Sequence, residues 1–456
     1  MQNFIDNASN ISVIAGAARI KSNNLINGCL IDPTNILATD AARIVSRHFT
    51  ANGNRGLFSQ DDINVYLAAS SLLHTLDAWV YLSHSVGSLL KGDPGISIHL
   101  AYYAELRASM SFLASEGIGI FSGVHLNVDS QNNTNQDPLP YRNGRKSGWG
   151  THKMVWEAIE KWSTSTVKPT TPDILKVFSV NGKGFDKWAL AFPNSSVLTG
   201  NGVIKQWLTN WNLDVNNFKS DRDDRNIVSY RPQRTSIITA KHSVNEIIDE
   251  LSSYWNLMEP SQSSRFQVLD RHLLKMFLQK LYTQLSPAIK ATLTLEEAIK
   301  STFDVLGESH NQSFIDFLKD TSTSHKIFLE AQEIAIDPTT GSINALAVIA
   351  RATLMLRIST GSTSVIFKEA GISMQDLDRL WDQYGIDSGL WSSGNAPQDF
   401  IELWDDIQDH IQDIDDWAEI RKPDLSLFHI YEDASIPLSF NYYKQFNRAG
   451  LWGLAI

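Results

Sequence analysis

IHLAYYAELRASMSFLASEGI, residues 98–118, has the spacing of a single long helix. Four of its apolar residues recur at steps of three and four, which places them on one helix face: Tyr103, Leu106, Met110 and Leu113. Gly117 follows them and predicts the helix end, because glycine readily adopts the backbone of a C-terminal cap. A tyrosine pair is unusual in a simple core helix, so this stretch is also the first place to look for function.

The segments around this helix predict a hairpin and a long loop. Residues 65–90 have helical apolar spacing, and the turn KGDPG at 91–95 separates them from the tyrosine-pair helix, which predicts an antiparallel pair. Residues 123–150 are polar and predict a long loop, a kind of segment that is usually functional or disordered. Thr151 is then expected to cap the next helix.

The whole chain reads as all-α, or mainly helical. We expect an N-terminal arm over 1–58 with a short helix at Ala41–Phe49, a helical bundle over 59–165, and a helical C-terminal region over 170–456 that forms one body or two subdomains. Strong helical patterns in that region include an amphipathic one at 266–281, a nearly apolar one at 343–358 and an acidic one at 402–419. Alternating strand patterns are scarce.

Composition narrows the classes of function. The 456 residues carry a net charge of −11, which argues against a dedicated nucleic-acid coat or a membrane-surface protein but permits a local basic groove. One cysteine excludes an intramolecular disulfide and a cysteine zinc site. No signal peptide and no apolar run of membrane-spanning length is visible, so a cytoplasmic protein without membrane contact is expected. Motifs of P-loop ATPases, zinc proteases and serine hydrolases are missing.

The hairpin, the tyrosine-pair helix, the polar loop and the following helix together resemble the HEPN superfamily over about residues 60–165. Leu100-Ala101-Tyr102-Tyr103-Ala104 with Arg107-Ala108 and Gly117 resembles one family helix, and Thr151-His152-Lys153 resembles the start of a later one. The resemblance implies a small helical bundle and a homodimer. It also implies, as in many members, RNA cleavage without metal by an Arg and a His separated by four to six residues.

Arg145 and His152 have six residues between them and are the predicted catalytic pair. A histidine can take the proton of the RNA 2′-hydroxyl, and an arginine can stabilise the charge that develops on the phosphate. Arg142, Asn143, Tyr102 and Tyr103 are predicted to shape the site and bind the substrate. Arg142 resembles the arginine of the family pattern more closely, but it lies too far from His152. The competing interpretation is that Arg145 and His152 are ordinary surface residues.

A second group of cations spans residues 222–234. Its members Arg225, Tyr230 and Arg231 are predicted to hold a phosphate backbone, with stacking on the tyrosine. Asp221, Asp223 and Asp224 offset this charge, so internal salt bridges that order a loop are the competing interpretation.

Three further patterns have mainly structural interpretations. Arg265 and His272 also have six residues between them and are expected to share one helix. Arg351 and Arg357 interrupt the apolar helix, and we expect them to pair with the acidic C-terminal third. Asp406, His410 and Asp413 share a helix face that is more typical of a solvated face than of a metal site, so no metal and no cofactor is expected.

These observations predict a stress or antiviral-defence protein that cleaves RNA as a metal-independent endoribonuclease. The alternative is a non-catalytic helical scaffold, or a binding subunit of a larger nuclease or ATPase complex. A scaffold of this kind predicts a large apolar surface patch for its protein partner.

Overall fold

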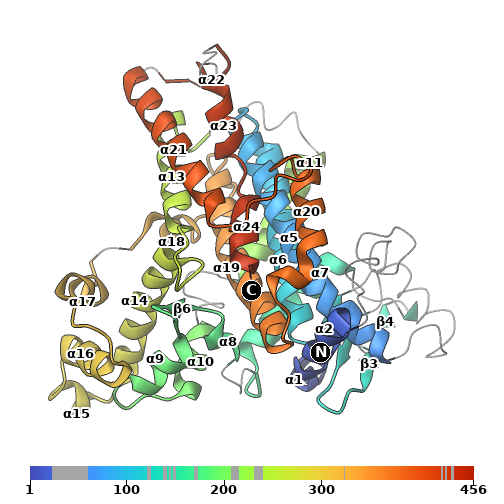
Figure 1. The fold of residues 1–456 in the computed structure, drawn as a ribbon, viewed down its shortest axis with the longest axis vertical. Coiled ribbons are helices and arrows are strands. Elements are labelled where there is room, and N and C mark those ends of the chain that lie inside the picture. The colour runs from blue at the N-terminus through green and yellow to red at the C-terminus, as the bar shows by residue number, and fades with distance from the viewer. Residues whose placement is uncertain are drawn as a thin grey trace.

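The computed structural model describes residues 1–22, 60–120, 125–136, 141–142, 145–146, 150–168, 173–206, 215–230, 240–322, 324–422, 425–426, 429–432 and 436–455. The fold is mainly helical with few short strands, as the sequence predicts (Figure 1). The predicted helix at Ala41–Phe49 lies outside the described residues.

The helices are α1 (Gln2–Asn7), α2 (Ile11–Ser22), α5 (Gln60–Leu89), α6 (Pro94–Ser115), α7 (Thr151–Thr164), α8 (Asp173–Lys176), α9 (Phe185–Ala191), α10 (Val197–Gln206), α11 (Val215–Tyr230), α13 (Val244–Leu257), α14 (Gln267–Gln284), α15 (Pro287–Lys290), α16 (Leu295–Leu306), α17 (Gln312–Lys319), α18 (Lys326–Glu330), α19 (Ala345–Glu369), the 3-10 helix η2 (Met374–Leu377), α20 (Asp378–Asp387), α21 (Glu402–Arg421), α22 (His429–Glu432), α23 (Pro437–Tyr443) and α24 (Asn447–Leu454). The strands are β1 (Ile118–Ile120), β2 (His125–Val128), β3 (Thr134–Gln136), β4 (Tyr141–Arg142), β5 (Arg145–Lys146), β6 (Ser179–Val180) and β7 (Lys183–Gly184).

The predicted hairpin forms the centre of the molecule. Helices α5 and α6 lie side by side and are joined by a tight turn (Figure 1). The Asp93 side chain accepts a hydrogen bond from the backbone N–H of Ile96 and caps α6, while Pro94 occupies the first helical position, where its missing N–H is tolerated. Gly117 has a φ of 84°, the left-handed conformation that favours glycine, just beyond the helix end.

Helix α6 differs from the prediction of one apolar face. It is buried on most of its circumference, because α5, α7, α11 and α19 all pack against it. Residues His99, Tyr103 and Arg107, at successive steps of four, form its partly exposed stripe. Leu106, Met110 and Leu113 are buried as the sequence predicts, whereas Tyr103 lies on the stripe that reaches the surface.

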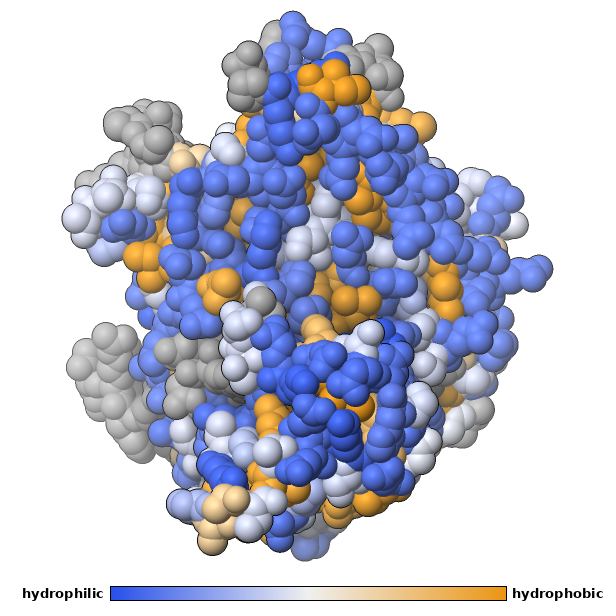
Figure 2. Space-filling view, turned by 90° about the vertical axis from the view of Figure 1, so that its left-hand side faces the viewer, coloured by the Kyte–Doolittle hydropathy of each residue, from blue (hydrophilic) through white to orange (hydrophobic). Residues whose placement is uncertain are grey.

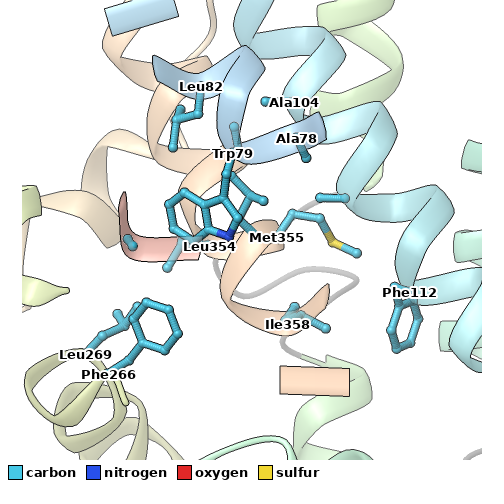
Figure 3. Close-up of a cluster of buried hydrophobic side chains, with 14 of the residues drawn as sticks. Ala78, Trp79, Leu82, Ala104, Phe112, Phe266, Leu269, Leu354, Met355 and Ile358 are labelled. Atoms are coloured by element: carbon cyan, nitrogen blue, oxygen red, sulfur yellow. The ribbon is translucent and has the colours of Figure 1, made fainter. Parts of the chain in front are cut away.

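Helix α19 provides the core that connects the first part of the chain with the last. It packs against α5, α6 and α24 and is buried along almost its whole length. The Trp79 indole of α5 points toward the stretch of α19 that carries Leu354 and Met355 (Figure 3), and its N–H donates to the Thr360 hydroxyl at 3.0 Å. The predicted division into 59–165 and 170–456 stays a prediction, but the helices of both ranges share this packed centre.

Residues 123–150 contain strands, so the prediction of a loop is wrong for the part that the structure describes. Strands β1, β2 and β3 form an antiparallel sheet in the order β1-β2-β3, and β4 pairs with β5 in a short hairpin. Buried His125 and Asn127 alternate with apolar residues on β2, and Asn127 donates to the Phe4 carbonyl of α1. Because these buried residues are polar, the spacing of apolar residues does not predict the strand.

Helix α7 begins at Thr151, but Gly150 is its N-cap and no side chain caps it, which corrects the predicted role of Thr151. Residues 215–230 form helix α11 rather than a loop ordered by salt bridges. Both helices pack against α6.

Most of the remaining helices form two groups: a lobe beside the central hairpin, and a pair of helices, α21 and α23, away from that lobe (Figure 1). The lobe contains α9, α10 and α14–α17, and α21 packs against α23. Figure 2 shows the face of the molecule on the side of this lobe, which is mostly hydrophilic with small separate hydrophobic patches. Within the described residues, no helix is long and apolar enough to cross a membrane.

The two arginines of α19 form buried ion pairs. Arg351 donates from Nε and Nη2 to the two carboxylate oxygens of Asp221 at 2.7 and 2.6 Å. Arg357 makes the same two-pronged contact with Asp270 of α14 at 2.8 and 2.7 Å. The prediction of ion pairs is confirmed, but the expectation that their partners lie in the acidic C-terminal third is wrong.

We expect Asp221→Ala to destabilise the fold by about 3–5 kcal/mol, because it leaves the Arg351 guanidinium charged and without its carboxylate in the core. Asp223→Ala is the matched control in the same helix: Asp223 is exposed and pairs with Arg222, so its loss costs at most about 1 kcal/mol. Urea unfolding measures both. Equal stability of Asp221→Ala and wild type would contradict a structural role for the pair.

Candidate functional site

Six side chains from four helices meet at the partly exposed stripe of α6. We call them the Tyr103 cluster: Tyr81 of α5, His99, Tyr102 and Tyr103 of α6, His152 of α7 and Arg225 of α11. The Tyr103 ring lies at the centre, with the ring centroids of Tyr81, His99 and His152 at 5.4, 5.1 and 5.8 Å. The predicted residues Tyr102, Tyr103, His152 and Arg225 are therefore brought together from three separate parts of the chain.

His152 is held by a buried hydroxyl. Its Nδ1 lies 2.8 Å from the Tyr102 oxygen, and the Trp156 indole N–H donates to the same oxygen at 3.4 Å. Tyr102 and Trp156 are fully buried, whereas His152 is half-buried at the first turn of α7. The buried Tyr102 hydroxyl thus holds Nδ1 of His152, while the imidazole remains partly exposed.

Arg225 supplies a permanent charge beside these rings. Its guanidinium carbon lies 5.3 Å from the Tyr102 ring centre and 5.6 Å from that of Tyr103, which is the geometry of a cation–π contact. Its Nε has no hydrogen-bond partner among the described residues. One turn later, Ser229 forms a hydrogen bond with Nδ1 of His99 at 2.6 Å and connects α11 to α6 again.

The histidines of this face have lowered pKa values. Burial, followed by the charges of Arg225, Arg222 and Arg107, lowers the pKa of His152 to about 4. Burial and Arg225 lower the pKa of His99 in the same way. At neutral pH the positive charge of the face therefore resides on its arginines, while the imidazoles are neutral and able to accept a proton.

A layer of buried charge beneath the cluster fixes the position of α11. Arg351 contacts Asp221 as described, and its Nε lies 3.6 Å from Oε1 of Glu105 on α6. Burial and the neighbouring Asp221 raise the pKa of Glu105 well above its usual value, opposed by the charge of Arg351. Burial also raises the pKa of Asp224 to about 7. Because Asp221 precedes Arg225 by four residues, this layer places Arg225 over the tyrosine pair.

The remaining predicted site residues are less completely defined. Arg145 precedes Thr151, the first residue of α7, by six residues. Arg142 and Arg145 are backbone partners in the β4–β5 hairpin. Their side chains, and all of Asn143 and Arg231, lie outside the described residues, so these four remain predictions. Tyr230 ends α11 and is 77% exposed.

The alternative patterns do not form a comparable site. Arg265 precedes α14 and donates to the Trp452 carbonyl at 3.1 Å, whereas His272 is inside that helix and contacts Phe317 and His325, so the expectation of one shared helix is wrong. In α21, Asp406 binds Arg448, and Asp413 accepts a hydrogen bond from Ser439. No group of three or more metal-binding side chains occurs in the part of the chain that the structure describes.

His99, Tyr81 and the buried Glu105 were missed by the sequence reasoning. His99 and Tyr103 are separated by four residues, and this spacing could have marked the exposed stripe of α6. Glu105 carried a weaker signal, a lone acid in an apolar helix, whose partner Arg351 lies far along the chain. Comparison with known families, curated proteins and solved structures found no match to this chain.

We expect the His152 imidazole to titrate with a pKa near 4 and Arg225→Gln to raise that value, because the substitution removes a nearby positive charge. NMR of histidine-labelled protein measures both, and His152→Gln identifies the resonance by its loss. Between the usual value of 6.5 and about 4, native His152 binds fewer protons than the unfolded chain, so its effect is to reduce stability as the pH falls through this window. A titration near 6.5 in both proteins would contradict this description of the site.

Proposed function

We propose that this chain is a metal-independent endoribonuclease and that the Tyr103 cluster is its active site. The observation that carries the proposal is the placement of a neutral, half-buried histidine near the Arg225 guanidinium, which lies over two tyrosine rings and whose buried Nε is unpaired among the described residues. A proton acceptor and a permanent cation are the two groups that RNA cleavage without metal requires.

The proposed chemistry uses the two ends of the His152 ring differently. The proposal assigns His152 the tautomer in which Nδ1–H donates to the Tyr102 oxygen, so that the Nε2 lone pair takes the proton of a ribose 2′-hydroxyl. The 2′ oxygen then attacks the adjacent phosphorus, a 2′,3′-cyclic phosphate forms, and the 5′ oxygen leaves with a proton from water. The Arg225 guanidinium stabilises the negative charge that grows on the phosphate oxygens. Tyr102 acts as a positioning residue.

Arg145 remains part of this proposal as a second cation at the scissile phosphate. The β4–β5 hairpin that carries it precedes α7, at whose start His152 lies. Arg142, Asn143 and Arg231 are proposed substrate contacts on the same grounds. The homodimer and the role in stress or antiviral defence rest on the resemblance to the HEPN superfamily alone.

The alternative of a non-catalytic scaffold has less support. It expects a large apolar patch, whereas the face in Figure 2 is mostly hydrophilic. Most of the large exposed apolar side chains of the described residues come from different elements, as Ile11, Leu198 and Ile420 illustrate, although Ile227 and Tyr230 share α11. Scattered residues of this kind are normal for a protein surface.

We expect purified protein to cleave single-stranded RNA in EDTA. His152→Ala removes the proposed base and lowers kcat by about 10²–10⁴-fold. Arg225→Ala removes the charge on the developing phosphate anion and lowers kcat by about 10²–10³-fold. Product analysis should find 2′,3′-cyclic phosphate ends, and the acid limb of the wild-type kcat profile should lie near pH 4.

His310→Ala is the histidine control, because His310 is an exposed residue that pairs with Asp304 and is not part of the cluster. It should cleave as wild type does. Equal activity of wild type, His152→Ala and Arg225→Ala would assign the cleavage to another site. RNA binding without cleavage by the wild type would favour the binding-subunit alternative.

Tyr230 tests substrate binding without disturbing the core. We expect Tyr230→Ala to raise KM with little change in kcat, because an exposed ring that stacks on one base contributes about 1–3 kcal/mol to binding. Ile420→Ala removes a similarly exposed apolar side chain from α21 and serves as the control. An unchanged KM for Tyr230→Ala would remove this residue from the substrate path.

A further inference from the structure

A cavity of about 720 Å³ lies at the junction of the lobe and the central helices. Five segments form its wall: residues 176–187 between α8 and α9, the loop 260–266 before α14, the second half of α19, residues 399–401 and the end of α24. None of its lining residues belongs to the Tyr103 cluster. Its size falls in the range of small-molecule sites.

Gly361 allows the walls to approach this closely. A Cβ atom at this position would lie 2.5 Å from Cγ1 of Val177 and 2.6 Å from Nη1 of Arg357. A glycine in the middle of a buried helix normally destabilises it relative to alanine, and here the absence of a side chain permits α19 to contact the 176–187 segment. The shape of the cavity is therefore built into the sequence of α19.

Five cations line the cavity, and two of them are neutralised. Arg357 is paired with Asp270, and Lys176 with Glu369 at 2.7 Å. The other three are Arg265, Lys187 and Lys368. None of these three has an ion-pair partner within the described parts of the chain, and the two further carboxylates of the wall are Asp186 and Asp399.

Arg265 is the most unusual of these cations. It is largely buried, and its Nη1 donates to the Trp452 carbonyl rather than to a carboxylate. Burial lowers the pKa of Arg265 to about 10, opposed by the charge of Asp399, so the group is still protonated at neutral pH. A guanidinium in this setting interacts more strongly with an anion than one in water does.

Aromatic side chains line the same wall as the cations: the Arg357 guanidinium lies 5.0 Å from the Phe266 ring centre. Phe266, Phe400 and Trp452 line it, and all three are buried in the core. The loop before α14 is rigidified by its own hydrogen bonds, since the hydroxyl oxygen of Ser261 accepts from the backbone N–H groups of Ser263 and Ser264. The cavity wall thus contains both aromatic rings and cations that are unpaired among the described residues.

We propose that this cavity binds a small phosphorylated ligand of nucleotide size, with the phosphate held by Arg265, Lys187 and Lys368. A phosphate dianion matches several separated cations better than a single carboxylate does, and Arg265 offers it a planar pair of N–H donors. The planar organic group then lies toward Phe400 and Trp452. This site is independent of the proposed RNA cleavage, so the failure of one proposal leaves the other standing.

Isothermal titration of the full chain with AMP, ADP, inorganic phosphate and adenosine tests the proposal. We expect one mole of AMP or ADP to bind per mole of chain, at least 10-fold more tightly than phosphate, and adenosine not to bind. The double variant Lys187→Glu/Lys368→Glu changes two exposed side chains and should weaken nucleotide binding by at least 10-fold. Arg265→Gln should abolish it.

Lys91→Glu is the matched control, because Lys91 is an exposed lysine in the turn before α6 that does not line the cavity. It should bind as wild type does. The lysine pair keeps the test decisive if Arg265→Gln fails to fold, which circular dichroism shows. Absence of nucleotide binding by the wild type, unchanged binding by the lysine double variant, or phosphate bound as tightly as AMP would overturn the proposal.

Discussion

The buried contact between Arg351 and Asp221 is the constraint on which the candidate site depends. A guanidinium in the core must have its donors satisfied, and Arg351 achieves this with both oxygens of Asp221 and with the carbonyls of Ala331 and Glu333. These partners come from α11 and from the segment after α18. The contact therefore sets the position of α11 along α6, and with it the place of Arg225 one turn after Asp221.

The electrostatic balance of the Tyr103 cluster follows from this arrangement. Arg225 lies against two tyrosine rings rather than a carboxylate, so its charge remains available to the surface. The same charge, added to burial, keeps His152 neutral. If Asp221 or Asp224 faced outward instead, they would pair with Arg225 and raise the pKa of the histidine. Their burial around Arg351 separates the acids of α11 from its bases, although both alternate along one short stretch of sequence.

This separation explains what the sequence could and could not predict. Local spacing was sufficient for the hairpin of α5 and α6, for α14 and for α19, because their apolar residues repeat at helical steps. It was insufficient for α11, whose apolar residues are few and whose helical state depends on Asp221 reaching an arginine 130 residues away. It also missed the β1–β3 sheet, whose middle strand buries polar residues.

The candidate site shows the same division between local and long-range information. The tyrosine pair and His152 could be proposed from residue types near one another in the sequence, and the structure brings them into contact. Arg225 was also predicted to bind phosphate, but its place near His152 could not be predicted, because it depends on the packing of α11 on α6. Spacing to a histidine selected Arg145, whereas three-dimensional proximity adds Arg225. Residue spacing in the sequence thus predicts contacts between neighbouring helices better than it predicts which distant arginine lies beside them.

Helix α19 holds in place the residues of both the Tyr103 cluster and the cavity. Its two arginines are six residues apart, and each binds a carboxylate from another helix. Arg351 fixes α11 beneath the Tyr103 cluster, while Arg357 fixes α14 and forms part of the wall of the 720 Å³ cavity. Sites supported by a rigid, fully packed helix hold their side chains more accurately than sites on loops. Because the same helix supports both, any displacement of α19 along its axis would alter the cluster and the cavity together.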